Sequence, residues 1–287
     1  MSAWLNTGML PLETFLRNMA KIQCSIGMLT FNSGTTLRRA LESVKDFDDI
    51  IVCDGGSTDD TLTIAREYGV RIIAQNSECK NENGSLKDFA CAKNQLIDEA
   101  RRPYLLILDS DEVASAELVD ELRRIAEKGG EDGYRIPIRM WWKGKMIEYA
   151  ANYPGYQYRI VRTDRDVRMV KPVHERPRFS RPLDVTKTTL NAPWYVYLDD
   201  DFVYNYMERN GKYAQRELEA FGPVSLRRWL GVMVLKNLRS IAGIVLKTFW
   251  YRVRYPRAVH MSLLVEWGRV QYHFLLITGA AKQICRI

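Results

Sequence analysis

Two carboxylates follow a short apolar run near the middle of the chain. The run is Leu105–Leu108, and Asp109 and Asp111 come directly after it, separated by Ser110. Such a run predicts a buried strand, and in an open α/β sheet ligands bind at the carboxyl ends of the strands. Two carboxylates one residue apart suit a divalent cation held against a diphosphate. The pattern therefore predicts chemistry on a nucleotide-linked substrate.

The same acids have a second interpretation, as the acidic start of a helix. Negative side chains are favoured there by the helix dipole, which would account for Glu112 and Glu117. It accounts poorly for Asp109, because that residue closes an apolar strand. Adjacent acids also cannot all stay charged and unpaired. We therefore favour a nearby cation.

A glycine-containing turn follows another predicted strand. Residues 52–61 read VCDGGSTDDT, and the two glycines permit backbone angles that other residues avoid. Asp54 would lie at the carboxyl end of the strand, where it could accept hydrogen bonds from a base or a ribose. The alternative is an ordinary turn in which Ser57 or Thr58 caps the next helix. A dinucleotide fingerprint is excluded, since G-x-G-x-x-G is absent.

Two further motifs carry groups that could act on a phosphate or a hydroxyl. Lys93 and Asn94 lie in a predicted helix, and His174 and Glu175 lie between two prolines in PVHERP. A lysine near the sheet edge can neutralise phosphate, a histidine can bind a metal, and a glutamate can be a general base. However, most helical lysines are merely solvated, and a single loop histidine is more often structural.

The elements that would position these residues alternate between strand and helix. Strands are predicted up to Thr30 and over 49–53, 70–74 and 104–108, and helices over 10–20, 35–44, 59–68, 86–100 and 115–128. This alternation implies right-handed crossovers and a mostly parallel central sheet flanked by helices. From Gly133 the pattern changes to short segments that predict antiparallel strands. The fold class is α/β, with amphipathic helices towards the C-terminus.

Charge is distributed unevenly along the 287 residues. The net charge is +7, but residues 202–287 hold 14 Lys and Arg against 4 Asp and Glu. A mildly acidic body thus precedes a strongly basic segment, which suggests an anionic partner. Five scattered cysteines predict a reducing compartment and no disulfide framework, and Cys24 and Cys53 fall in buried strands. We find neither a signal peptide nor an uninterrupted apolar run of spanning length.

The basic segment predicts a helix that contacts a membrane. Residues 225–257 contain no Asp or Glu, and on a helical projection Lys236, Arg239 and Lys247 share a narrow sector opposite a wide apolar face. Such a helix fits an anionic membrane surface with its basic side towards lipid phosphates, and residues 261–281 would pack beside it. The alternative is burial against the N-terminal domain or a second protomer. Nucleic acid is disfavoured, because the apolar face is broad and no recognition motif is present.

Taken in order, these motifs resemble the family 2 glycosyltransferases of the GT-A fold. The TFN end of the first strand, the VCDGGSTDDT turn, the AKNQ helix and the LDSDE edge occur in that family's order and spacing. The resemblance is closest to one branch, the β-glucosyltransferase-like enzymes of lipopolysaccharide core synthesis. That branch also carries a stretch like PGYQYRIVRTDR that leads to Val173-His174-Glu175. The resemblance covers about residues 22–180.

The resemblance implies a role for each motif. Thr30 and Asp54 would lie by the nucleotide base. Asp109 and Asp111 would hold the ribose and a Mg²⁺ or Mn²⁺ ion on the diphosphate. The implied nucleotide-sugar contacts are Thr30, Asn32, Asp54, Gly56, Ser57, Lys93, Asp109 and Ser110, and the implied metal contacts are Asp109, Asp111 and His174.

The resemblance also implies a base that deprotonates an acceptor hydroxyl, which then attacks the anomeric carbon and inverts it. Glu175 is the first choice for this base, with residues 199–201, all aspartates, as alternatives. Gly55 departs from the family, which often has Asp or Ser after the residue that matches Asp54. One contact of the turn is therefore in question.

We therefore expect an inverting, metal-dependent glycosyltransferase that moves a hexose from a UDP-sugar to a membrane-associated glycan or lipid-linked acceptor in lipopolysaccharide or surface polysaccharide synthesis. The expected domains are a GT-A catalytic domain over 1–203 (nucleotide-sugar half about 20–130, acceptor half about 131–203) and a basic helical region over 204–287. That region would bind the cytoplasmic face of the plasma membrane peripherally or form a homo-oligomer. The alternatives are a nucleotidyltransferase and a non-catalytic membrane-bound scaffold that binds sugar nucleotides.

Overall fold

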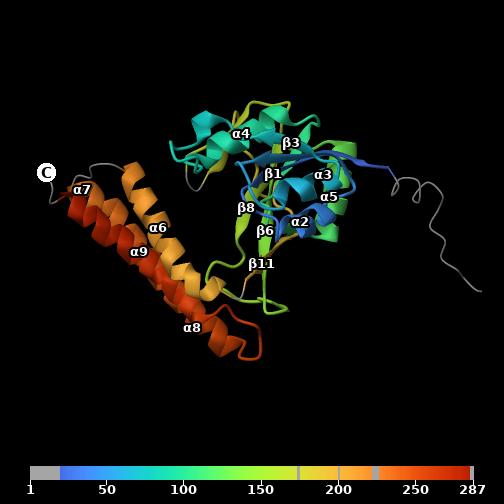
Figure 1. Cartoon of the computed structure of the whole chain (residues 1–287). Coiled ribbons are helices and arrows are strands. Elements are labelled where there is room, and N and C mark those ends of the chain that lie inside the picture. The colour runs from blue at the N-terminus through green and yellow to red at the C-terminus, as the bar shows by residue number, and fades with distance from the viewer. Residues whose placement is uncertain (1–19, 173–174, 200, 222–225, 285–287) are drawn as a thin grey trace, which may run out of the picture. The chain divides into compact units, whose positions relative to one another are not determined.

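The computed structural model describes residues 20–172, 175–199, 201–221 and 226–284. Two compact units divide the chain (Figure 1). The first unit is formed by Met1–Arg135, Tyr158–Val170 and Arg176–Ala192, and the second by Ile136–Gln157, Lys171–Glu175 and Pro193–Ile287. The helix predicted over 10–20 lies outside the described residues.

A mostly parallel sheet forms the centre of the first unit. Its strands run in the order β3-β2-β1-β4-β8, with β1 at Ile22–Thr30, β2 at Phe47–Asp54, β3 at Arg71–Ala74, β4 at Tyr104–Ile107 and β8 at Tyr156–Arg162. The pairs β1–β2, β1–β4 and β2–β3 are parallel, and β8 is antiparallel to β4. The predicted fold class is confirmed.

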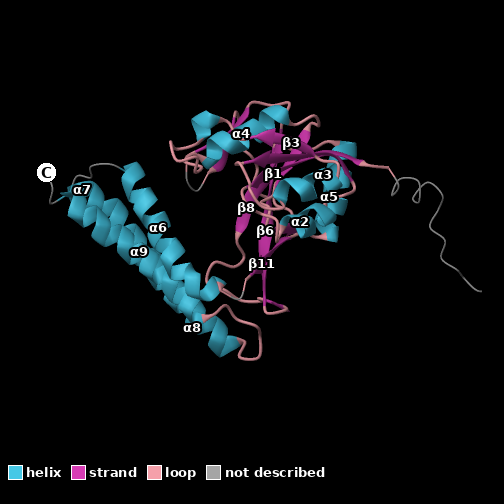
Figure 2. Ribbon diagram, viewed as in Figure 1, coloured by secondary structure: helices cyan, strands magenta, loops and turns pink. Residues whose placement is uncertain are grey.

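Helices cover both faces of this sheet, as right-handed crossovers require. They are α2 (Leu37–Ser43), α3 (Thr61–Glu67), α4 (Phe89–Glu99) and α5 (Ala116–Lys128), with a single 3₁₀ turn, η1, at Ser77–Cys79 and a short strand, β5, at Glu112–Ala114. In Figure 2, α2 and α3 lie on one side of the strands and α4 on the other. The predicted boundaries of these helices differ from the observed ones by at most three residues.

The register of the sheet brings the ends of its central strands together. Thr30 pairs with Asp54 at the carboxyl ends of β1 and β2, and Gly27 pairs with Ile107 at the end of β4. A Cβ on Gly27 would come within 3.0 Å of the Leu96 side chain, so α4 packs directly on β1. The sheet edge that follows these strands is therefore fixed by a tightly packed core.

A two-stranded ribbon borders α4. It consists of β9 (Val167–Val170) and β10 (Arg176–Phe179), which are antiparallel. The side chain of Asn94 donates to the carbonyl of Met169 at 3.0 Å and accepts from its N–H at 2.8 Å. Asn94 thus links α4 to β9 through two hydrogen bonds.

The second unit combines three strands with the C-terminal helices. Strand β6 (Gly133–Trp142) pairs with β7 (Lys145–Met146) and β11 (Trp194–Leu198). The helical part comprises α6 (Phe202–Phe221), α7 (Leu226–Arg228), a π-helical stretch η2 (Trp229–Val234), α8 (Leu235–Arg254) and α9 (Leu263–Ile284). Helix α9 packs against both α6 and α8, so the predicted packing of the second apolar stretch beside the basic helix is confirmed.

One described helical stretch, Trp229–Arg254, is long and apolar enough to cross a membrane, judged by length and composition only. Its mean hydropathy is 1.5, and 12% of its most apolar window is buried. This stretch is not an uninterrupted apolar run, because Lys236 and Arg239 lie within it. A single helix of this kind is weak evidence of a span.

The expectation that the cysteines form no disulfide is wrong. Cys79 in η1 and Cys91 in the first turn of α4 are bonded to each other, because the fold brings two segments 12 residues apart into contact. Cys24 and Cys53 are free and buried, as expected. Burial raises the pKa of the Cys53 thiol to about 12, which makes this thiol inert at neutral pH.

Candidate functional site

Asp54 organises the turn between β2 and α3. Its Oδ2 accepts hydrogen bonds from the N–H groups of Gly56 and Ser57, both at 2.8 Å. Its Oδ1 accepts from the hydroxyls of Ser57 at 2.6 Å and Thr30 at 2.9 Å. Burial would raise the pKa of Asp54, but these hydrogen bonds outweigh it and the pKa lies below its usual range. The residue is therefore a fixed anion whose acceptor positions hold the turn in shape.

Glycine is required at one position of this turn. Gly56 has a φ of +100°, a conformation that side-chain-bearing residues rarely adopt. The alternative in which Ser57 or Thr58 caps the following helix is wrong, because α3 begins only at Thr61. Instead, the Ser57 hydroxyl donates to Asp54.

The end of β1 is joined to the same turn. The N–H of Asn32 donates to the Ser57 hydroxyl at 2.8 Å, and the Asn32 side chain accepts from the N–H of Thr58 at 2.9 Å. Next to it, the hydroxyls of Ser33 and Ser110 lie 2.8 Å apart. The fold thus brings together the predicted residues of three separate motifs at one edge of the sheet.

Asp109 is held between two cationic side chains. Its Oδ2 lies 3.2 Å from Nη1 of Arg159, and its Oδ1 lies 3.8 Å from Nζ of Lys93. Lys93 is buried, so the interpretation of this residue as a solvated helix lysine is wrong. Burial would raise the pKa of Asp109, but Arg159 and Lys93 together hold it below its usual range. Asp109 is therefore an anion at neutral pH.

Glu112 is a buried partner of the same cluster. Its carboxylate accepts from the N–H of Asp109 and from Nη2 of Arg159, both at 2.8 Å. Burial raises the pKa of Glu112 to about 7, opposed by Arg159. Sequence reasoning missed both partners: Arg159 comes from β8, which is distant in sequence, and Glu112 was attributed to a helix start.

The helix-start interpretation holds for Glu117, which lies in the first turn of α5, but not for the other acids. Glu112 lies in strand β5, and α5 begins at Ala116, where the Ser115 side chain caps it by accepting from the N–H of Leu118 at 3.1 Å. Asp109 and Asp111 therefore lie in a connection between β4 and β5. They cannot serve as an N-terminal cap of α5.

The residues at this edge fit a divalent cation. Asp111 is exposed and the side chain of Asp109 is 39% exposed, so both present carboxylate oxygens to solvent. Mg²⁺ is commonly bound by one or two carboxylates together with substrate phosphates. Among the described residues, Glu78, Cys79 and Cys91 form another group with metal-ligand atoms, but its two sulfurs are consumed by the disulfide.

The predicted base and the third predicted metal ligand lie in PVHERP. Glu175 is partly buried and directly precedes β10. His174 falls outside the described residues, as does Asp200, while the alternatives Asp199 and Asp201 are exposed. The catalytic role of Glu175 and the metal role of His174 stay predictions.

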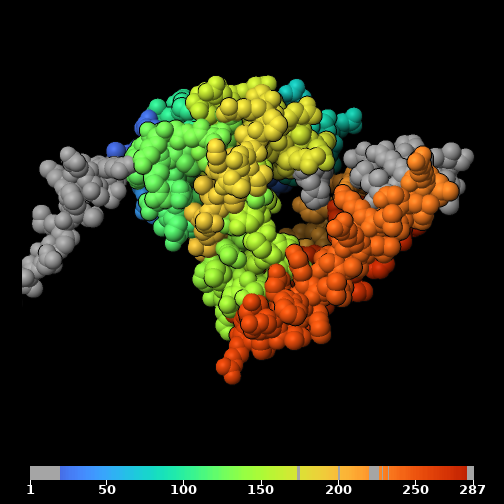
Figure 3. All heavy atoms as spheres, turned by 180° about the vertical axis from the view of Figure 1, so that it is seen from behind, coloured from blue at the N-terminus to red at the C-terminus, as the bar shows by residue number. Residues whose placement is uncertain are grey.

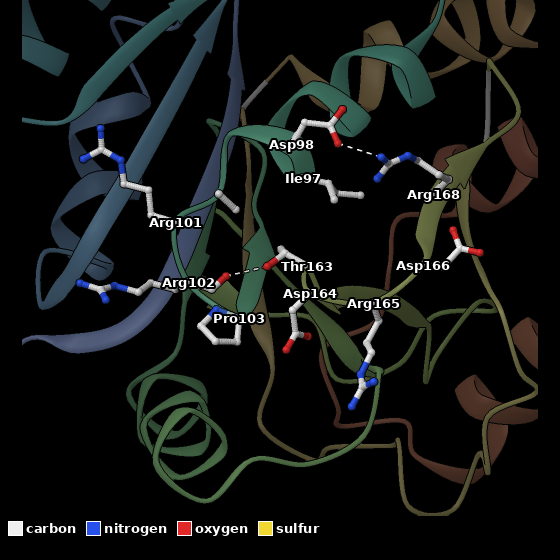
Figure 4. A pocket seen from close by; sticks show the side chains of 11 residues that line it. Ile97, Asp98, Arg101, Arg102, Pro103, Thr163, Asp164, Arg165, Asp166 and Arg168 are labelled. Atoms are coloured by element: carbon white, nitrogen blue, oxygen red, sulfur yellow. Dashed lines mark hydrogen bonds and ion pairs between the residues drawn. The ribbon is translucent and has the colours of Figure 1, made fainter.

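A hollow of about 460 Å³ lies in the first unit, and Figure 4 shows the side chains that line it. It lies at the opposite end of β4 from Asp109, because Arg102 and Pro103 precede that strand. Its charges are largely used within the protein: Arg168 pairs with Asp98 at 2.9 Å, and the Arg102 guanidinium pairs with Asp48. We therefore place the candidate site at the Asp109 edge.

Comparison with known proteins matches the region that holds this edge. The model of glycosyl transferase family 2 matches residues 25–180, more than half of the chain. The chain belongs to glycosyl transferase family 2. The family assignment made from the motifs is confirmed, and the matched region contains Asp54, Lys93, Asp109, Arg159 and Glu175.

Individual proteins are also similar to this chain. A TPR repeat-containing protein of Synechococcus elongatus is 31% identical over 157 residues, and the glycosyltransferase SunS of Bacillus subtilis is 29% identical over 156 residues. The matches cover 54% and 53% of this chain but only 36% and 34% of those proteins. A solved structure of S. aureus TarS 1–349 in complex with UDP is 17% identical, covers 93% of this chain and 92% of that one, and has a TM-score of 0.42.

Proposed function

We propose that this family 2 protein is an inverting glycosyltransferase that transfers a hexose from a UDP-sugar to a membrane-associated glycan or lipid-linked acceptor. One observation carries the proposal: Asp109, 3.8 Å from the buried Lys93, and the exposed Asp111 lie at the edge that the Asp54 turn also borders. A role in lipopolysaccharide synthesis is the finer proposal. It rests on the resemblance of residues 154–175 to the lipopolysaccharide-core branch of the family.

The side chains at this edge suit a nucleoside diphosphate sugar. The fixed Asp54 turn offers a rigid wall for the nucleoside, since its shape is determined before any ligand arrives. Lys93 supplies positive charge next to the place where the diphosphate would lie. Asp109 and Asp111 would hold Mg²⁺ or Mn²⁺, which when bound supplies charge stabilisation to the leaving nucleoside diphosphate.

Acceptor activation is assigned to Glu175. A carboxylate base accepts the proton of the acceptor hydroxyl while the hydroxyl oxygen attacks the anomeric carbon from the side opposite the leaving group. One displacement of this kind inverts the configuration at that carbon. His174 is proposed as an additional contact to the metal or the diphosphate.

A membrane-bound acceptor is supported by the surface of α8. Large apolar side chains are exposed along one face of this helix, at Leu235, Leu238, Val245, Leu246, Phe249, Trp250 and Val253. In Figure 3 the orange-red band of α8 lies open along its length. An apolar face bordered by lysines and arginines is typical of helices that lie in a membrane interface. We therefore propose peripheral attachment to the cytoplasmic face of the plasma membrane, with the apolar face, not the basic side, entering the lipid.

The decisive experiment is a product analysis with a panel of sugar nucleotides and Mg²⁺ or Mn²⁺. Slow breakdown of the correct donor needs no acceptor, so the donor can be found before the acceptor is known. Release of free UDP is the expected result. A parallel assay with nucleoside triphosphates and sugar 1-phosphates tests the alternative, since pyrophosphate released from the triphosphate would identify a nucleotidyltransferase. Binding of UDP without any turnover in either assay would identify a non-catalytic scaffold.

Membrane attachment has its own experiment. The full-length chain should sediment with vesicles that contain anionic lipid, and the double variant Leu246→Glu with Phe249→Glu should stay in solution. The matched control is Lys128→Glu at an exposed position of α5 in the first unit, which lowers the net charge by the same two units. Equal sedimentation of both variants would show that the apolar face of α8 is not the attachment surface.

A further inference from the structure

A cavity of about 450 Å³ lies within the helical part of the second unit. Its walls come from α6, α8, α9 and the loop at 151–152, and its lining residues are Ala151, Asn152, Tyr206, Asn210, Tyr213, Ser240, Gly243, Ile244, Lys247, Arg269, Tyr272 and His273. This volume falls within the usual range of small-molecule sites. None of these lining residues is acidic, whereas Lys247 and Arg269 are cationic.

The guanidinium of Arg269 is built into the wall. Its Nη1 pairs with Glu266 at 2.9 Å, and its Nε donates to the Tyr206 hydroxyl at 3.4 Å. Glu266 is buried and also accepts from the N–H of Ala151 at 2.9 Å. Arg269 is therefore fixed in place by partners behind it, while it lines the cavity in front. A preorganised cation of this kind binds an anion at low entropic cost.

The remaining polar wall consists of groups that are neutral at physiological pH. Burial lowers the pKa of His273, although Glu217 opposes the shift, and the His273 ring is hydrogen-bonded to the Asn237 side chain at 2.6 Å. The Tyr272 hydroxyl donates to Glu217. Positive charge in the cavity therefore comes from Lys247 and Arg269, which face a wall of tyrosine rings. Such a site suits a phosphate group attached to an apolar body.

The position of Lys247 on α8 connects the cavity to the exposed apolar face. At about 100° per residue, Gly243 and Lys247 fall between the cavity-lining Ser240 and Ile244 on one side and the exposed Leu246 and Trp250 on the other. A ligand whose charged end lies in the cavity can thus pass the rim at Gly243 and continue along apolar side chains. Cationic groups in the cavity and apolar side chains beyond its rim match a lipid with a phosphate headgroup.

We propose that this cavity binds the phosphate headgroup of an anionic lipid, whose hydrocarbon chains lie along the exposed face of α8. The proposal gives the attached protein a specific lipid site in addition to a general attraction to negative charge. It rests on the membrane attachment proposed above and is independent of sugar transfer.

The first test measures binding of a short-chain phosphatidic acid, used below its micelle concentration so that no charged surface contributes. The full-length chain should bind it, and Lys247→Gln should weaken binding at least about tenfold. The matched control is Lys282→Gln, which removes an exposed lysine of α9 that does not line the cavity. Its binding should change less than about twofold. Equal losses in both variants would overturn the site.

The second test fills the rim of the cavity. A Cβ on Gly243 would meet no atom within 4 Å, and replacing a helical glycine stabilises a helix by up to about 1 kcal/mol. Gly243→Leu should therefore fold at least as well as the wild type and lose short-chain lipid binding. Undiminished binding by this variant would overturn the proposal.

Two measurements distinguish the lipid site from a simple phosphate site and from the proposed sugar transfer. Inorganic phosphate should bind at least about a hundredfold more weakly than the short-chain lipid, because it lacks the chains; equal affinity would make the cavity a phosphate site and overturn the lipid assignment. UDP release by the wild-type chain is measured in lipid-free solution. Its absence, with lipid binding intact, would contradict the proposed function and leave this inference standing.

Discussion

Arg159 forms an ion pair with Asp109, with 3.2 Å between Nη1 and Oδ2, although the two residues are fifty positions apart. The same guanidinium contacts Glu112 at 2.8 Å. One arginine on β8 thus fixes two carboxylates that follow β4. Because β8 is antiparallel to β4, the rigidity of the acidic edge depends on a strand that lies outside the parallel set β3-β2-β1-β4.

Removal of Arg159 should destabilise the protein in a pH-dependent way. Arg159→Ala leaves the buried Glu112 without its cationic partner, which typically costs about 3–5 kcal/mol of the free energy of unfolding. The cost should be smaller at pH 6 than at pH 8, because the raised pKa of Glu112 allows it to be neutral at the lower pH. Urea unfolding at both pH values measures this.

The control for Arg159 is Arg168→Ala. Arg168 forms an ion pair with Asp98 in which both side chains are more than half exposed, so its loss should cost less than about 1 kcal/mol. Similar losses for the two variants would mean that Arg159 does not compensate buried acids.

Asp111 should matter for activity and not for stability. Asp111→Asn keeps the size of an exposed side chain, so the free energy of unfolding should change by less than about 0.5 kcal/mol. UDP release should fall at least about a hundredfold, because the metal on the diphosphate loses a ligand. Asp120→Asn, an exposed substitution on α5, is the control. Normal turnover of Asp111→Asn after chelation of divalent cations would refute the metal role.

Asp54 should contribute to stability above pH 4 and lose that contribution in acid. Its pKa in the folded chain lies below the usual value of about 4, so the folded state binds this proton less readily than the unfolded state. The contribution is complete above the unfolded pKa and disappears as pH falls through the folded pKa. Asp54→Asn should therefore show a shallower fall in unfolding free energy below pH 4 than the wild type.

A second variant tests whether the effect at Asp54 comes from its hydrogen bonds. Ser57→Ala removes one of the side-chain donors to Asp54, so its acid-induced loss should be intermediate between the wild type and Asp54→Asn. An unchanged slope in Asp54→Asn would show that the hydrogen bonds of the turn do not stabilise the carboxylate.

Glu175→Gln should reduce transfer at least about a hundredfold if Glu175 is the base. Glu82→Gln, an exposed substitution in the 80–85 loop, should behave as the wild type. A near-normal rate would transfer the role of base to Asp199 or Asp201.

Local patterns were sufficient to predict the parallel strands and helices of the first unit. The run 105–108 is apolar because β4 is buried on both faces, and the turn after β2 carries glycine because Gly56 needs a positive φ. Each is a property of a few consecutive residues, so the sequence determined it. The family motifs followed for the same reason, since Thr30 and Asp54 each end a strand and Asp109 follows β4 closely.

Only the tertiary structure decided which distant residues meet. Arg159 joins Asp109 and Glu112 because β8 pairs with β4, and Cys79 bonds to Cys91 because η1 lies against α4. The same holds for α8, whose small and polar residues face the other helices while its apolar residues are exposed. Composition alone predicted an amphipathic helix, but which face is covered depends on what the chain packs against it, and that is settled by contacts between segments far apart in sequence.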